Sequence, residues 1–257
     1  KRFKEYCSSY GVIKILAAAT SAVRESPNGR DLIKSVKENI GIDIELISGA
    51  EEARLIYLGV LSGMSLENKS QVILDIGGGS TEIILANSKD TRALTSARVG
   101  AVRLKNDFFK DEPLTTSRIE FLKTFIQGSL EPSIGKIKRR LKKNESFSMI
   151  ATSGTAIALG NLISSDLGEP KQKMHGYNFS KFNLERLLSK LIKLSPNERR
   201  EIPSLSERRS EIIVPGGLIL ETTMEMLKIN NLTISERALR EGLVVDWMIR
   251  KGMLTSK

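Results

Sequence analysis

The chain has 257 residues, of which 40% are hydrophobic and 27% are charged, and this balance excludes an intrinsically disordered protein. The length is compatible with one large domain or with two lobes. The net charge of +10 at pH 7 favours a negatively charged partner, such as a phosphate compound, a nucleic acid or an anionic membrane surface.

Cysteine content and hydropathy narrow the class of protein further. Cys7 is the only cysteine, which excludes a disulfide framework and a thiolate metal cluster and favours the reducing cytoplasm. No apolar run approaches the ~20 residues that a membrane-spanning helix needs, and the first ten residues do not form a signal peptide. We therefore expect a cytoplasmic protein with no membrane partner.

The first part of the chain predicts alternating helices and strands, as in the later half of an α/β lobe. Arg24 follows the first of these strands beside small hydroxylated residues, where its guanidinium is well placed to bind a phosphate. The alternative is a solvated surface arginine. The expected elements are helices over residues 2–10 and 30–40 and strands over residues 12–17 and 42–47.

A helix is predicted to start at Ser48. Ser48 and Glu51 have the spacing of a capping box, in which each side chain binds the other residue's backbone N–H. Glu52 points about 100° around the helix from Glu51, so the cap does not account for it. Glu52 is a candidate functional carboxylate in the first helical turn. The alternative is an acid that only complements the helix dipole.

A glycine-tipped hairpin is predicted over residues 72–85. Apolar residues form the incoming strand, three glycines follow, and the outgoing strand is again apolar. Glycines can adopt positive φ and carry no Cβ, so a phosphate oxygen can approach several N–H groups at once. The predicted phosphate-binding residues are Gly77, Gly78, Gly79, Ser80 and Thr81.

Two carboxylates flank this loop. Asp75 ends the incoming strand and Glu82 begins the outgoing one. A carboxylate repels phosphate, so both acids are explained if Mg²⁺ lies between them and the substrate, since this ion binds one or two carboxylates together with water and phosphate oxygens. The alternative is a tight glycine turn with two exposed acids.

Further along the chain, a strand is predicted over residues 92–99 and a helix from residue 100. Helices are predicted over residues 117–127 and 132–141, and a strand over residues 147–152. This last strand leads into Gly154 at the start of a helix, where backbone N–H groups could bind an anion or ribose. A plain tight turn is the alternative.

The basic run from Lys136 to Lys143 is interpreted as a solvated helix face, because no aromatic residues interleave to stack nucleic-acid bases. His175 is the only histidine and is expected at the surface. The remaining predicted elements are helices over residues 184–194, from Ser195, from Pro215 and from Ser235 or Glu236. The last of these helices has Gly242 in its middle, which is tolerable if another backbone packs close to it.

Residues 74–82, with the sequence LDIGGGSTE, resemble the second phosphate loop of the exopolyphosphatase/guanosine pentaphosphate phosphohydrolase (Ppx/GppA) family. Other segments resemble further blocks of this family in the same order. These segments are residues 19–24, 47–55, 99–104, 152–156 and 238–243.

The resemblance implies the two-lobed α/β superfold of actin, sugar kinases and Hsp70, with a ribonuclease-H-like second half. The family's first phosphate loop has no counterpart after Lys1, so the first lobe is expected to be incomplete. Residues 1–56 would belong to the N-terminal lobe and residues 57–257 to the C-terminal lobe, with the active cleft between them. The resemblance also implies that Glu52 is the catalytic base, that Arg209, next to Arg208, faces the cleft as a second candidate phosphate ligand, and that Gly154 belongs to a nucleotide-facing loop. The family segment around Arg24 favours its role as a phosphate ligand.

The function implied is a phosphohydrolase that releases terminal phosphate from inorganic polyphosphate, guanosine pentaphosphate or both, with Mg²⁺ on Asp75 and Glu82. One alternative is a non-catalytic protein that binds (p)ppGpp or polyphosphate. Another is a small-molecule kinase of the same superfold. Nucleic acid is not the expected partner, and the sequence leaves open whether the protein is a homodimer.

Overall fold

A computed structural model describes residues 1–66, 69–109 and 114–254. At its centre is a six-stranded mixed sheet with the order β5-β4-β3-β6-β8-β7. β3, β4 and β5 form an antiparallel meander, and β6 and β8 continue the sheet parallel to β3. This is the ribonuclease-H-like arrangement that was expected. The strands are β3 Ser70–Ile76, β4 Thr81–Ala86, β5 Thr91–Ala97, β6 Phe147–Thr152, β7 Asn178–Ser180 and β8 Asn231–Ile234.

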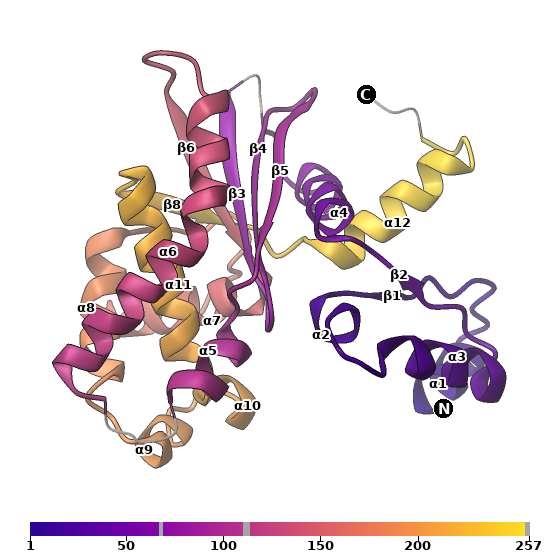
Figure 1. Ribbon diagram of the computed structural model, residues 1–257, viewed down its shortest axis with the longest axis horizontal. Coiled ribbons are helices and arrows are strands. Elements are labelled where there is room, and N and C mark those ends of the chain that lie inside the picture. The colour runs from indigo at the N-terminus through magenta and orange to yellow at the C-terminus, as the bar shows by residue number, and fades with distance from the viewer. Residues whose placement is uncertain (67–68, 110–113, 255–257) are drawn as a thin grey trace.

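Helices cover both faces of this sheet (Figure 1). On one face lie α4 Gly49–Leu61 and α12 Leu239–Arg250, and on the other α5 Ala101–Phe108, α6 Thr116–Arg140, α7 Ser153–Asp166, α8 Lys181–Leu191 and α11 Ile213–Leu227. The short helices α9 Pro196–Arg200 and α10 Glu207–Ser210 complete this side, and the capping box predicted at Ser195 begins α9.

Alternation along β3 and β4 decides which side chains face α4. Leu74 and Ile83 belong to the large core under α6 and α11, whereas Ile73 and Ile84 pack with α4 in a smaller core. Successive strand residues point to opposite faces. Asp75 and Glu82 therefore lie on the α4 side of the sheet.

The N-terminal part contains α1 Arg2–Ser9, α2 Ser21–Arg24 and α3 Gly29–Ile40, so the two helices expected here are confirmed. The strand expected over residues 12–17 is wrong, and Ile13 is 97% exposed. Within the described residues, β1 Ala18–Ala19 pairs only with β2 Glu45–Leu46. Apolar alternation does not make a strand unless a neighbouring strand and a packed face stabilise it.

A single helix, α6, replaces the two helices expected over residues 117–127 and 132–141. Pro132 lies inside it and costs a backbone hydrogen bond. The helix continues because its buried residues keep helical spacing through the proline and pack beneath the sheet; they are Leu122, Ile126, Leu130, Ile134 and Ile137. The basic side chains of its last turns are exposed, as expected for a solvated face.

Helices α4 and α12 cross in direct backbone contact. A Cβ on Gly242 would lie 1.8 Å from the carbonyl oxygen of Leu55, and one on Gly59 would lie 1.8 Å from that of Ala238. The expectation that another backbone packs close to Gly242 is confirmed. Helix α12 begins at Leu239, later than expected. The Thr152 hydroxyl donates to the carbonyls of Ser235 and Arg237, and these contacts hold the residues before the helix in a turn.

Other differences are small. α11 begins at Ile213, before Pro215, and the sequence did not indicate the short strands β7 and β8. Among the helices of the described residues, none has both the length and the hydropathy needed to cross a membrane.

Candidate active site

The glycine loop between β3 and β4 is anchored through its carbonyl groups. The Gly77 N–H donates to the Ser80 carbonyl at 2.9 Å and closes the turn. The carbonyls of Gly77 and Gly78 accept from the first N–H groups of α5, each at 3.0 Å. Among the backbone hydrogen bonds of the described residues, none uses the N–H of Gly78 or Gly79. These two N–H groups can therefore donate to an anion.

The three glycines are needed for close approach rather than for unusual torsion angles. None of Gly77, Gly78 and Gly79 adopts the positive φ that is open to glycine. A Cβ on Gly79 would lie 2.6 Å from the Ser21 hydroxyl, which comes from α2. The absence of Cβ atoms lets α2 pack directly against the loop.

The two acids that flank the loop are buried, which excludes the reading of two exposed acids. Asp75 and Glu82 are opposite one another in the β3–β4 register, and 9% and 1% of their surfaces are exposed. Directly opposed residues of antiparallel strands place their side chains on the same face. Glu82 also accepts a hydrogen bond from the Ser96 hydroxyl at 2.7 Å.

Glu52 lies in the first turn of α4 and is 7% exposed. The Ser48 hydroxyl accepts from the Glu51 N–H at 3.2 Å, as predicted. The return bond of the capping box is not formed, because the Glu51 carboxylate binds Arg54 with two contacts of 2.7 and 2.8 Å. A bidentate pair with arginine is stronger than a bond to a backbone N–H. Glu52 has no part in this cap.

The three buried carboxylates Glu52, Asp75 and Glu82 influence one another. Burial raises the pKa of Asp75 to about 7, and the neighbouring Glu52 charge adds to the effect. Burial raises the pKa of Glu82 to about 8, with further contributions from Glu52 and Asp75, against hydrogen bonds from Ser96 and Ser80. Burial also raises the pKa of Glu52, while Arg24 opposes the increase. The site therefore concentrates negative charge that a cation would stabilise.

Arg24 is held between the N-terminal segment and Glu52. Its Nη1 donates to the Ile47 carbonyl at 2.8 Å and approaches Glu52 Oε2 at 3.4 Å. Arg24 and Ser80 line a cavity of about 570 Å³, together with Ser96 and Arg98. Arg24 is therefore a partly buried arginine paired with Glu52, and not a solvated surface arginine.

Gly154 and Arg209 meet at a second cavity, of about 450 Å³, on the other side of the glycine loop. Asp75, Gly77 and Gly78 also line it. A Cβ on Gly154 would lie 1.9 Å from Arg209 Nη2, so glycine is required for the guanidinium to lie there. Burial and the nearby Arg208 lower the pKa of Arg209, and in the described part of the chain no carboxylate forms an ion pair with it. An unpaired, half-buried cation favours an anionic ligand.

The backbone beside Gly154 is strained. Ser153 has φ of 82°, a value that residues other than glycine rarely adopt, and it lines the same cavity. Such strain concentrates at functional sites. Gly154 therefore lies at a strained junction between β6 and α7.

Thr81 differs from the other predicted loop residues. It is fully buried, and its hydroxyl donates to the Val99 carbonyl at 2.6 Å. This side chain fastens β4 to the residues just after β5, and Thr81, like Gly79, lines neither cavity.

His175 is half-buried, not at the surface as expected. Its Nδ1 accepts from the Glu236 N–H at 3.2 Å, so the proton is on Nε2, which contacts the Gly63 carbonyl at 3.0 Å. His175 is a structural link between two loops.

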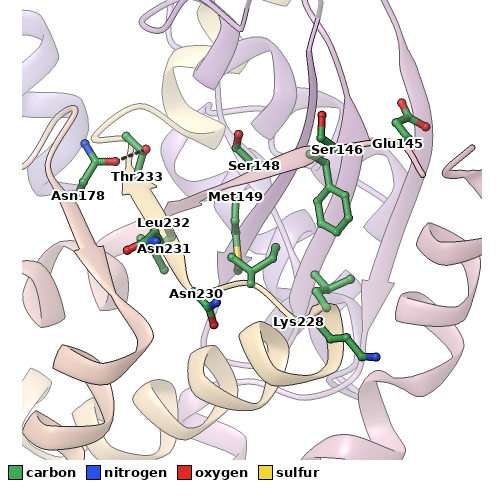
Figure 2. A pocket seen from close by; sticks show the side chains of 13 residues that line it. Glu145, Ser146, Ser148, Met149, Asn178, Lys228, Asn230, Asn231, Leu232 and Thr233 are labelled. Carbon is green, nitrogen blue, oxygen red and sulfur yellow. Dashed lines mark hydrogen bonds between the residues drawn. The ribbon is translucent and has the colours of Figure 1, made fainter. Parts of the chain in front are cut away.

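A third cavity, of about 640 Å³, lies at the opposite end of the sheet. Figure 2 shows its lining at the beginnings of β6 and β8, with Lys228 and Asn230 at the end of α11. Ligands of such sheets bind at the carboxyl ends of the parallel strands, where the glycine loop lies. We therefore do not assign the chemistry to this cavity, although it is larger.

Several side chains at the site were not singled out from the sequence. Ser96 could have been found only from the register, since it is opposite Glu82 on β5. Ser21, Glu25 and Arg98 have no local pattern that marks them, because only the folded chain brings them to the loop. Arg103 lies within residues 99–104, but its contact with the Gly79 carbonyl is a tertiary one.

The family model and the similar proteins of known function point to the same family. The sequence model of the Ppx/GppA phosphatase family matches residues 1–251. Exopolyphosphatase 1 of Mycobacterium leprae is 28% identical over 246 residues, which cover 95% of this chain and 70% of that protein. Exopolyphosphatase 1 of Mycobacterium tuberculosis is 29% identical with the same coverage.

Solved structures agree. The crystal structure of an exopolyphosphatase from Cytophaga hutchinsonii has a TM-score of 0.88 and 27% identity, and the match covers 98% of this chain and 79% of that one. The Aquifex aeolicus member of the Ppx/GppA family has a TM-score of 0.80 and 26% identity, covering 97% of this chain and 79% of that one. These likenesses confirm the predicted fold class.

Proposed function

Because the chain belongs to the Ppx/GppA phosphatase family, we propose that it hydrolyses phosphoric anhydride bonds and releases terminal phosphate from inorganic polyphosphate, guanosine pentaphosphate or both. The observation that carries this proposal is the position of Glu52. Its carboxylate is buried next to Arg24, raises the pKa values of Asp75 and Glu82 at the two ends of the glycine loop, and has no structural role in the helix cap. Similarity to proteins named exopolyphosphatases supports the substrate class.

In this proposal Glu52 orients a water molecule and accepts its proton as the water oxygen attacks the terminal phosphorus. Burial raises the pKa of Glu52, which makes its carboxylate a stronger base than an exposed glutamate. Arg24 fixes the direction of the carboxylate. The proton moves from water to Glu52, and the leaving group is the shortened phosphate chain.

The glycine loop and Arg209 would bind the phosphoryl group that is transferred. The N–H groups of Gly78 and Gly79 are available to its oxygens, and Arg209 lines the same cavity as Gly78, without a carboxylate partner among the described residues. Donors fixed in advance stabilise the charge that develops in phosphoryl transfer without reorganisation. Arg24 and Ser80 line the neighbouring cavity, where adjoining phosphates would lie.

We extend the proposal to Mg²⁺, which Asp75 and Glu82 would hold. The two carboxylates are buried and opposed, and the Asp75 charge helps to raise the pKa of Glu82, so a divalent cation fits their charge. Within the described residues, no group of three His, Cys, Asp or Glu side chains could hold a metal ion. Two carboxylates suit Mg²⁺, which keeps several waters and takes phosphate oxygens. When bound, the ion would neutralise charge on the phosphates.

The test is phosphate release from polyphosphate and from guanosine pentaphosphate in the presence of Mg²⁺. We expect Glu52→Gln to lower kcat by a factor on the order of 10² to 10⁴, the range for a lost general base, with KM little changed. Glu51→Gln is the matched control, because this neighbouring acid binds Arg54 instead of facing the loop. Unchanged turnover in Glu52→Gln would remove Glu52 from the mechanism. Binding by the wild type without phosphate release would favour a non-catalytic binder, and transfer of phosphate to a second substrate would favour a kinase.

A further inference from the structure

Glu25 joins two arginines at the edge of the site. It follows Arg24 at the end of α2, and its Oε2 accepts from Arg98 Nη2 and from Arg103 Nη2, each at 2.7 Å. Arg98 Nε adds a contact of 3.2 Å. Burial works to raise the pKa of Glu25, but the hydrogen bonds from Arg98 and Arg103 outweigh it and hold the pKa below its usual value. One carboxylate oxygen thus bridges two guanidinium groups.

Arg98 and Arg103 lie next to the proposed phosphate loop. Arg103 Nε donates to the Gly79 carbonyl at 3.1 Å, so its guanidinium lies against the loop. Glu25 and Arg98 line the cavity of about 570 Å³ that Arg24 and Ser80 also line. The arginines therefore lie on the path that a phosphate chain would take away from the loop.

The contacts of the two arginines resemble those made to a phosphate oxygen. Guanidinium groups bind carboxylate and phosphate in the same fork geometry. Among the hydrogen bonds of the described residues, none uses Nη1 of Arg98 or of Arg103. Arg98 is 77% exposed, so it is accessible to a ligand from solution. A tetrahedral phosphate offers more oxygens than the one that Glu25 supplies.

We propose that the Glu25 carboxylate occupies the position of a substrate phosphate, and that Arg98 and Arg103 form a subsite for phosphates beyond those at the glycine loop. The subsite rests on the proposed function, because it requires a substrate with several linked phosphates. Linear inorganic polyphosphate has that chemistry. Glu25 leaves the arginines when the chain binds and so competes with it.

Because Glu25 and Arg98 carry opposite charges, we expect their neutralisation to have opposite effects on polyphosphate binding. Glu25→Gln removes the competing negative charge and leaves both arginines in place, so long chains bind more tightly. Arg98→Gln removes a cation that only long chains reach. Because Arg98 is mostly exposed, its replacement does not open a cavity in the core.

The test measures dissociation constants by calorimetry for tripolyphosphate and for a longer polyphosphate of defined length. We expect Arg98→Gln to weaken binding of the longer chain by about 3- to 10-fold, as for a partly solvated charged contact, and to change tripolyphosphate binding less. We expect Glu25→Gln to strengthen binding of the longer chain by a similar factor. Arg186→Gln is the control, since this arginine pairs with Asp166 away from the site. Thermal unfolding checks that each variant is folded.

Weaker binding of the longer chain by Glu25→Gln would overturn the proposal, because Glu25 would then serve only to hold the arginines. Equal weakening of both ligands by Arg98→Gln would also overturn it, since that is a general charge effect. Phosphate release is measured on the same samples. Length-dependent binding without release would contradict hydrolysis and support the subsite, whereas release without length dependence would support hydrolysis and overturn the subsite.

Discussion

At the scale of single residues, the site is defined by carboxylates in places that disfavour negative charge. Asp75 and Glu82 face each other across two strands, and Glu52 approaches them from α4. Burying like charges together costs free energy unless a cation or a proton compensates. Among the described residues of this group, only Glu52 has an arginine partner, which is Arg24. Asp75 and Glu82, with pKa values of about 7 and about 8, need a proton or a cation instead.

This arrangement predicts that Mg²⁺ stabilises the fold as well as assisting turnover. We expect a saturating Mg²⁺ concentration to raise the Tm of the wild type, because a ligand at 100 times its Kd adds about 2.7 kcal/mol to the free energy of unfolding. The double variant Asp75→Asn, Glu82→Gln should lose this increase, whereas Asp166→Asn, which alters a pair far from the site, should keep it. Thermal unfolding with and without Mg²⁺ measures the effect. An equal increase in the double variant would show that the ion binds elsewhere.

At the scale of elements, the site depends on how α4 is held against the sheet. Glu52 reaches the carboxylates because the first turn of α4 packs on β5, where a Cβ on Gly49 would lie 2.5 Å from that of Ser96. The other side of α4 is fixed by α12. Arg54 of α4 binds Asp246 of α12 at 2.7 Å, and the two backbones touch at Gly59 and Gly242. The close crossing with α12 therefore holds α4 in position against the sheet.

Gly242→Ala tests this crossing. The added methyl group would lie 1.8 Å from the Leu55 carbonyl oxygen, so the helices must separate, and we expect the free energy of unfolding to fall by about 1–3 kcal/mol. Gly128→Ala is the matched control in α6, since no atom lies within 4 Å of its added methyl group. That variant should gain about 1 kcal/mol, the helix-propensity difference between glycine and alanine. Urea unfolding compares the two, and a stabilised Gly242→Ala would contradict the close contact.

At the scale of the whole molecule, the N-terminal part meets the sheet at the site itself. Ser21 lies against Gly79, Glu25 binds Arg98, and Arg24 binds Glu52. A ligand bound at the proposed glycine-loop site would therefore touch both parts of the molecule. The net charge of +10 on the whole chain favours a polyanionic ligand.

At the opposite end of the sheet, Glu145 binds Arg92, Ser70 and the Lys142 N–H. These contacts predict how the free energy of unfolding changes at low pH. Hydrogen bonds from Arg92, from the Lys142 N–H and from Ser70 lower the pKa of Glu145 from 4.5 to about 2. A carboxyl group whose pKa is lowered by folding stabilises the fold above its unfolded pKa, and this contribution is lost as the pH falls towards 2. We expect Glu145→Gln to lower the free energy of unfolding by about 1–3 kcal/mol at neutral pH.

Between pH 4.5 and 2, the free energy of unfolding of Glu145→Gln should depend less on pH than that of the wild type, because the variant has no carboxylate to protonate at this position. Urea unfolding over this pH range measures the difference. Glu131→Gln, on the exposed side of α6, is the control and should follow the wild type. Parallel curves for wild type and Glu145→Gln would show that the Arg92 pair does not stabilise the fold.

The sequence by itself determined the central hairpin and the identity of the glycine loop. Local signals suffice there, because the apolar strands, the three glycines and the flanking acids are consecutive in the chain. Helix α3 and the start of α4 were predictable for the same reason, since periodicity and the Ser48 cap are local. Glu52 could be singled out because the cap left it unexplained.

Only the tertiary structure decided the rest. Residues 12–17 carry a strand pattern but have no partner strand in the described chain, and α6 continues through Pro132 because its buried face packs under the sheet. Gly79 is needed because Ser21 of α2 packs against it, and none of the three loop glycines adopts positive φ. Glu25, Arg98 and Arg103 meet from distant parts of the chain, and such contacts arise from packing and charge pairing that no local pattern encodes.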